Sequence, residues 1–187
     1  MSTFSGGYTK TIALLFVCGI SSVCLVGCRS YPLEYAPGAK LKPDEGLVCG
    51  RVTALRYGQP IVYRNDFFSP GGMQVNVMPE EAKVSTPSLL RGDGRFCWHL
   101  PPGRYVIASF DRVVGNRFTS GRIWATFTVP AAGSRTCIGT LVISLRGDRY
   151  HCEVRDECDG LLTDWGANAL GSGDEWQKQL LVLDPMK

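Results

Sequence analysis

Hydrophobic and polar residues alternate along most of the chain from Gly46 onward, with the period of two that is typical of half-buried β-strands. In residues 95–100, Phe96, Trp98 and Leu100 fall on one face of an expected strand. The other expected strands are also short and rich in β-branched or aromatic residues. Together the expected strands span residues 47–55, 59–63, 73–78, 95–100, 104–110, 123–129, 137–145 and 150–154.

Turn signals separate these segments. The pair Asp93-Gly94 is typical of a tight turn, because glycine adopts positive φ without steric cost. Pro102-Gly103 ends the strand that follows. Further turns or loops are expected at residues 115–121, 130–134 and 146–148.

About seven to nine strands joined in this way predict an all-β fold, a single antiparallel β-sandwich. Its C-terminal tail is mixed. Residues 161–170 fit one or two helical turns, whereas residues 175–183 fit either a short helix or a last strand.

A different pattern occupies the N-terminus. A short polar start with one lysine is followed by an apolar stretch, which is the layout of a secretory signal. The stretch ends in Leu25-Val26-Gly27-Cys28, which resembles a bacterial lipobox: branched apolar residues, a small residue for the peptidase pocket, and the cysteine that takes lipid. The resemblance implies cleavage after Gly27 and a lipid anchor on Cys28.

An uncleaved signal anchor is the alternative interpretation. The apolar run is somewhat short for a spanning helix, which needs about 20 residues. Both interpretations place the body outside the cytoplasm. The predicted organisation is a lipoprotein signal peptide at 1–27, a lipid-anchored tether at 28–45, and a β-sandwich domain with a C-terminal extension at 46–187. An aspartate after the lipidated cysteine often marks inner-membrane retention; Arg29 stands there instead, which favours the outer membrane, facing the periplasm.

Composition narrows the class of partner. The 187 residues carry a net charge of +3 and are 44% apolar, so the chain is globular and too weakly basic to suggest nucleic acid. Its 22 glycines and 11 prolines favour a turn-rich β protein over a helical bundle. The expected partners are the membrane, through the lipid, and another protein of the envelope.

The segment 93–107 resembles a hairpin of carboxypeptidase regulatory-like domains, which share the transthyretin-like and Cna B-type sandwich. That family shows a Gly-x-Val opening strand, here residues 50–52, then a DG-x-F turn and an L-P-x-G-x-Y motif. The matching residues are Asp93, Gly94, Phe96, Pro102, Gly103 and Tyr105. The resemblance covers residues 46–110 and implies a core in which Tyr105 packs beside Phe96. It says little about function.

Five cysteines remain if Cys28 takes lipid. In an oxidising compartment an odd number leaves at least one thiol unpaired or paired with another chain. The sequence does not determine the connectivity, but the short separation of Cys152 and Cys158 favours a small disulfide loop between them. The other three lie in apolar strands, where a buried thiol and a disulfide are about equally expected: Cys49, Cys97 and Cys137.

No nucleophile elbow, Ser-x-x-Lys, HExxH or glycine-rich phosphate loop occurs, so neither an enzyme nor a cofactor is expected. A metal site formed by His151 and Cys152 with the acidic residues and cysteine at 156–158 is disfavoured, because its spacing differs from the CxxC type of zinc sites. Two Arg-Gly-Asp tripeptides, at 91–93 and 146–148, fall in expected turns, and turn chemistry explains them.

The preferred functional hypothesis is a non-catalytic binding or scaffolding module that docks another envelope protein, for example by strand addition at an exposed sheet edge. A small transthyretin-like lipoprotein that anchors a type VI secretion machine is an alternative that fits the length, anchor and fold class. Another is a carbohydrate- or peptidoglycan-binding module, which would need exposed aromatic residues on one face. A redox or metal protein that uses the odd cysteine is a further one. The candidates for sugar stacking are Trp98, Trp124, Trp165 and Trp176, of which the first two are expected in the core if they face inward.

Overall fold

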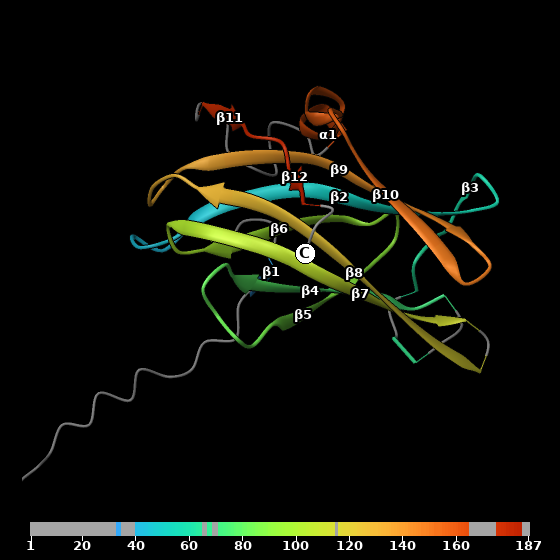
Figure 1. Cartoon of the computed structure of the whole chain (residues 1–187). Helices are drawn as coiled ribbons and strands as arrows, with labels where there is room; N and C mark the ends of the chain where they lie inside the picture. Colours follow the sequence, from blue (N-terminus) through green and yellow to red (C-terminus); the bar gives the residue numbers. More distant parts are fainter. Residues whose placement is uncertain are drawn as a thin grey trace, which may run out of the picture.

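The computed structural model describes residues 40–64, 67–68, 71–114, 116–164 and 175–184, together with the backbone of residues 33–34. These residues form two β-sheets that face each other, which confirms the predicted all-β sandwich (Figure 1). The first sheet has seven strands and the second has five.

The first sheet has the order β1–β6–β2–β9–β10, with β3 paired to β2 and β11 paired to β9. Its strands are β1 (Leu33–Glu34), β2 (Gly46–Arg56), β3 (Gln59–Pro60), β6 (Arg95–Leu100), β9 (Arg135–Arg146), β10 (Arg149–Arg155) and β11 (Trp176–Lys178). The second sheet has the order β12–β8–β7–β4–β5. Its strands are β4 (Met73–Pro79), β5 (Thr86–Leu90), β7 (Gly103–Val114), β8 (Arg117–Val129) and β12 (Val182–Leu183).

One short helix, α1 (Cys158–Asp164), follows β10 in the described part of the chain. It lies over β9, on the face of the first sheet that is turned away from the second sheet (Figure 1). We call this the outer face of the first sheet.

Two strand pairs depart from the predicted antiparallel arrangement. β2 and β9 run parallel, and so do β11 and β9. The whole of the second sheet except β12 lies between β2 and β9 in the sequence. Only a tight hairpin forces two strands to pair antiparallel; two strands joined by a connection this long can pair in either direction.

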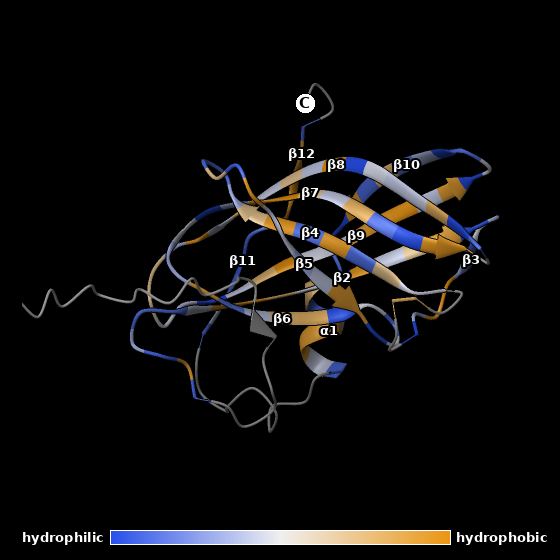
Figure 2. Ribbon diagram, turned by 90° about the horizontal axis from the view of Figure 1, so that it is seen from below, coloured by the Kyte–Doolittle hydropathy of each residue, from blue (hydrophilic) through white to orange (hydrophobic). Residues whose placement is uncertain are grey.

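The core lies between the sheets, where the alternating pattern places it. Phe96, Trp98 and Leu100 are all buried, as predicted. The rings of Phe96 and Trp98 stack with centroids 3.7 Å apart, and Trp98 Nε1 donates a hydrogen bond to Ser88 Oγ at 3.1 Å, from one sheet to the other. Figure 2 shows the same alternation as hydrophobic and hydrophilic bands along β4.

The segment that resembles a family hairpin crosses between the sheets. β6 belongs to the first sheet and β7 to the second, so the two strands do not pair with each other. The predicted packing of Tyr105 beside Phe96 therefore cannot occur within one hairpin: both residues belong to the core between the sheets, and Tyr105 stacks on Phe127 with centroids 5.6 Å apart. Its hydroxyl donates a hydrogen bond to the Pro101 carbonyl at 2.9 Å, which closes the turn.

Gly94 confirms the predicted Asp-Gly turn. Its φ is +82°, and a Cβ at this position would lie 1.9 Å from the Val52 carbonyl oxygen. The amide of Val52 in turn donates a hydrogen bond to the Gly94 carbonyl at 2.9 Å. Any residue with a side chain would collide with β2, so the position requires glycine.

Several segments differ from the sequence-based expectation. β5 was not predicted, because Pro87 interrupts its strand pattern. The predicted polar loop 115–121 is mostly strand, since β7 continues to Val114 and β8 begins at Arg117. In the tail, α1 begins at Cys158, ahead of the expected 161–170, and the choice left open for 175–183 is resolved in favour of two short strands.

The predicted tether also takes part in the fold. β1 pairs with His99 and Trp98 of β6. Glu45 is fully buried, and its Oε2 lies 3.3 Å from His99 Nδ1. Part of the segment 28–45 is therefore packed against the sandwich and does not act as a free spacer.

Candidate functional site

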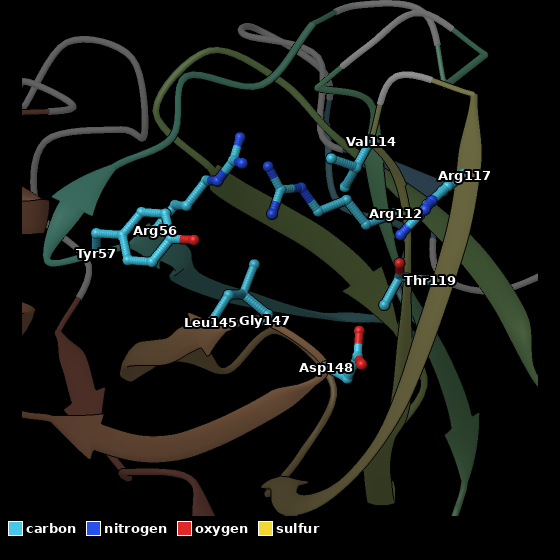
Figure 3. A pocket seen from close by; sticks show the side chains of 9 residues that line it. All are labelled: Arg56, Tyr57, Arg112, Val114, Arg117, Thr119, Leu145, Gly147 and Asp148. Carbon is cyan, nitrogen blue, oxygen red and sulfur yellow. The ribbon is translucent and has the colours of Figure 1, made fainter.

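A pocket of about 200 Å³ opens at one end of the sandwich, where both sheets finish (Figure 3). The first sheet contributes the end of β2 and the β9–β10 turn, and the second contributes the β7–β8 hairpin. We call it the arginine pocket. Its lining residues are Arg56, Tyr57, Arg112, Val114, Arg117, Thr119, Leu145, Gly147 and Asp148.

Arg112 occupies a core-facing position of β7. Phe110, two residues earlier on the same face, is fully buried in the core. Arg112 continues this row and is only 7% exposed. On β8 it faces Thr119, which also lines the pocket. A guanidinium in this place interrupts an apolar row, so the pocket begins where the core ends.

No protein group neutralises this charge in the described part of the chain. There, Arg112 Nε has no hydrogen-bond acceptor, and no carboxylate forms an ion pair with Arg112. Burial and the charge of Arg56 both lower the pKa of Arg112. The guanidinium nevertheless stays protonated at neutral pH, because its ordinary pKa is above 12. A buried charge without a partner is costly, and natural cores rarely retain one.

Arg56 lies on β2 of the first sheet, and the period of two along this strand places it on the face that lines the pocket. Val52 and Ala54 are buried in the core, and Arg56 follows them on that face of β2. Its guanidinium carbon lies 5.6 Å from the centroid of the Tyr57 ring, a cation–π geometry. Figure 3 shows the guanidinium groups of Arg56 and Arg112 next to each other. Arg56 itself is exposed, so an exposed cation and a buried one meet at this end of the sandwich.

The lining also contains polar residues from β8 and from the β9–β10 turn. Arg117 lies on the β8 side of the pocket, and Asp148 comes from the β9–β10 turn (Figure 3). The carboxylate of Asp148 and the side chain of Thr119 lie on the same side of the pocket (Figure 3). Three arginines against one aspartate leave the lining with a formal charge of 3 − 1 = +2. The pocket is therefore suited to an anion.

Tyr63 supports the first-sheet side of this end. Its hydroxyl donates to the Val52 carbonyl at 3.0 Å and accepts from the Ala54 amide at 2.6 Å. Burial raises the pKa of Tyr63, while the amide of Ala54 and the charge of Arg112 act in the opposite direction. The phenol therefore stays neutral and fixes the segment after β3 against β2.

The residues of the family-like motif do not line the arginine pocket. Asp93 lies in its turn and pairs with Arg95, Oδ2 to Nε at 2.8 Å. Pro102, Gly103 and Tyr105 line a different hollow of about 390 Å³, near the other end of β7. Phe96 is in the core. These residues thus lie in turns and in the core, and none of them lines the arginine pocket.

The cysteines pair differently from the prediction. Cys158 is bonded to Cys137, and Cys49 is bonded to Cys97. Cys152 is a free thiol packed against the core, and burial raises its pKa to about 11. The expected Cys152–Cys158 loop is wrong because the two side chains lie on opposite faces of the first sheet, one inside the sandwich and one under α1.

The remaining candidates have plain structural roles or fall outside the described residues. His151 is exposed, and Cys158, one of the other four proposed metal ligands, is in a disulfide. The described residues contain no group of three side chains placed to hold a metal ion. Both Arg-Gly-Asp segments lie at turns. Trp98 is buried, whereas Trp124 and Trp176 are half-buried; Trp165 lies outside the described residues.

The lipobox residues Leu25, Val26, Gly27 and Cys28 also lie outside the described residues. Within the part that is described, no helix has the length and apolar character needed to cross a bilayer. A comparison with protein-family models found no match, and none of the curated proteins compared with the chain matches it.

The arginine pocket was missed by the sequence analysis. The sequence feature that points to it is Arg112, which comes two residues after Phe110 and therefore lies on the same face of the strand. A β-bulge earlier in the strand makes it hard to predict which face that is. The register of β7 against β8 shifts between Ile107 and Ser109. Because of this shift, Phe110 and Arg112 face inward, although counting by twos from Tyr105 would place them outward.

Proposed function

We propose that the chain is a non-catalytic binding module of the bacterial cell envelope, exported and anchored by lipid on Cys28. Its sandwich presents one end to another envelope protein. The lipobox-like segment at residues 25–28 supports the anchor, and the folded β-sandwich supplies a rigid domain for docking. The observation that carries the docking proposal is a group of exposed aromatic side chains around the arginine pocket.

These side chains form an aromatic rim: Tyr57, Phe68 and Phe118, which are 74%, 84% and 63% exposed. Tyr57 lines the pocket, and Phe118 stands between two lining residues of β8. Phe67 connects the other two, since its ring centroid is 6.0 Å from that of Phe118 and 5.6 Å from that of Phe68. Single exposed apolar residues are normal, but aromatic residues gathered beside arginines are typical of protein interfaces.

The position of the rim relative to the anchor also favours docking. Leu33 of β1 pairs with His99, which lies opposite Leu47 on β2. The pocket residue Arg56 is nine residues farther along β2, or about 30 Å at the rise of a β-strand. Cys28 is five residues before Leu33, a reach of at most about 18 Å. The rim is therefore at the end remote from the membrane in which the lipid would be inserted.

Site-specific photocrosslinking in cells tests the proposal. A photoreactive residue at Phe118 should give one defined adduct with an envelope protein, and the same residue at Tyr57 should give the same adduct. The control position is Val84, which is 79% exposed and lies beyond the opposite end of β4. Adducts of equal yield from Val84, or none from the rim, would contradict docking through this end.

Lipidation is tested separately. Cells grown with a labelled fatty acid should incorporate the label into the wild-type chain and not into Cys28→Ser. Label that persists in Cys28→Ser would contradict the anchor. If the chain is lipidated but forms no protein adduct, the docking proposal fails while the anchor stands.

A carbohydrate- or peptidoglycan-binding module is the second candidate, because exposed aromatic rings also stack on sugars. Sedimentation with purified peptidoglycan distinguishes it from protein docking: Tyr57→Ser and Phe118→Ser together should abolish co-sedimentation if sugar stacking is the function. If the crosslinked protein belongs to a type VI secretion machine, it would instead identify the transthyretin-like lipoprotein of such a machine.

A further inference from the structure

We propose that the arginine pocket is a binding site for inorganic phosphate, bound as the hydrogen phosphate dianion. This inference needs only the pocket and holds whether or not the rim docks a protein. It starts from Arg112, which is 7% exposed and whose Nε has no acceptor within the residues that the structure describes.

The charge of the lining determines the charge of the occupant. The formal charge of +2 in the pocket is matched by an anion with two negative charges. A guanidinium presents several N–H donors in a plane, a geometry that fits the oxygens of phosphate in pairs. Arg56 and Arg112 supply two such groups from opposite sheets, next to each other (Figure 3). An anion between them would neutralise both charges.

The size of the pocket excludes large ligands. Its volume of about 200 Å³ is below the range of roughly 300–1,000 Å³ that drug-sized molecules occupy. It is several times the roughly 30 Å³ share of one water molecule in the liquid. A single oxyanion with a few waters fits these limits.

Asp148 and Thr119 select among dianions. A carboxylate beside the anion is repulsive unless the anion donates a hydrogen bond to it. Hydrogen phosphate has one P–OH group that can donate to Asp148, whereas sulfate has none. The Thr119 hydroxyl can donate to a phosphate oxygen. The lining therefore predicts a preference for phosphate over sulfate, although both ions carry two charges.

Calorimetry and thermal unfolding of the full chain in detergent, at neutral pH and constant ionic strength, test the inference. Inorganic phosphate should bind in a saturable manner and raise Tm, because a ligand that binds only the folded state stabilises it. Sulfate should bind at least about ten-fold more weakly. Losing the charge-assisted hydrogen bonds in Arg112→Met should weaken phosphate binding by about ten- to one-hundred-fold.

Two variants keep the result interpretable. Arg104→Met removes the same charge near the opposite end of β7, where Arg104 pairs with Glu80 at 3.0 Å, and should leave phosphate binding unchanged. Asp148→Asn should reduce the preference for phosphate over sulfate. Because methionine suits an apolar row, Arg112→Met is expected to fold, and its own Tm without phosphate verifies this.

A third ligand tests the role of the P–OH donor. The dianion of a phosphate monoester such as glycerol 3-phosphate has no P–OH group, so it should bind much more weakly than inorganic phosphate. Equal binding of glycerol 3-phosphate would contradict selection through Asp148. The proposal is wrong if phosphate causes no saturable shift, if sulfate binds equally well, or if Arg112→Met binds phosphate like the wild type.

Discussion

Two groups of arginines in this sandwich differ in what surrounds them. On the outer face of the first sheet, Arg51 lies 3.5 Å from a Glu157 oxygen and 3.7 Å from an Asp93 oxygen. At the end of the sandwich, Arg112 is more deeply buried, and no carboxylate pairs with it within the described residues. The first arrangement attaches a turn and the segment before α1 to the sheet. The second leaves positive charge available for something that is not part of the chain.

The disulfides follow the same division. Cys49–Cys97 joins β2 to β6 on the outer face, and Cys137–Cys158 joins β9 to α1. Covalent bonds and ion pairs therefore concentrate on the outer face, whereas the pocket end carries unpaired charge and exposed aromatic rings. Regions that bind are commonly less stable than the scaffold that holds them, because their groups are arranged for a ligand and not for each other.

The largest expected effect is on the outer face. Replacing Cys49 and Cys97 by alanine opens a loop of 48 residues and should lower the free energy of unfolding by about 4 kcal/mol. Replacing Cys137 and Cys158 opens a loop of 21 residues and should cost about 3 kcal/mol. Urea unfolding of each pair variant measures both. Phosphate affinity should not change, and a large change would mean that the two regions are coupled.

Arg112→Met should change the free energy of unfolding in the opposite direction. Removing a buried, unpaired charge from an apolar row should raise the free energy of unfolding by about 1–2 kcal/mol in phosphate-free buffer. Urea unfolding with and without phosphate measures the change. If the variant is clearly less stable than the wild type without phosphate, Arg112 has a structural partner and the contrast between the two groups fails.

Arg51→Met should be mildly destabilising, by about 1 kcal/mol, since its ion pairs are partly exposed and screened by water. The effect should shrink at high salt, because screening weakens pairs of this kind. The measurement is urea unfolding at low and high ionic strength. A gain in stability from Arg51→Met would contradict the assignment of this group as a structural network.

The smallest expected effects concern Cys152, whose thiol packs against the core between the sheets, away from the pocket. Its reactivity therefore measures how well this side of the first sheet is shielded from water. Its pKa of about 11 leaves about one thousandth of the thiol ionised at pH 8, so alkylation should be about one-hundred-fold slower than for a thiol with an ordinary pKa near 9. Alkylation rates in the native and urea-unfolded protein measure this. Equal rates would show that the inner face is open to water.

The same raised pKa has a consequence for stability. Since the folded state favours the protonated thiol, its contribution is fully present below the ordinary pKa near 9 and is lost as pH rises through about 11. Tyr63 acts in the same direction at still higher pH, because burial raises its pKa too. Cys152→Ala should therefore flatten the loss of stability between about pH 9 and 11, measured by urea unfolding across that range.

Local features of the fold were predictable from the sequence. The phases of Phe96, Trp98 and Leu100 and the turn at Gly94 depend on neighbouring residues, and each is confirmed. β5 was missed because Pro87 is disfavoured in strands, and it is tolerated here since β5 is at the edge of its sheet. The lipid anchor on Cys28 stays a prediction.

What the sequence determined by itself was the class of fold and the positions of most strands and turns. Alternation and turn chemistry act within a few residues, so they can be read without knowing the tertiary structure. The tertiary structure alone decided that β2 and β9 are parallel, that Cys158 pairs with Cys137, and that Arg112 faces inward. Each of these depends on which segments meet in space or on a one-residue bulge that reverses the phase of a strand, and neither is encoded in a local pattern.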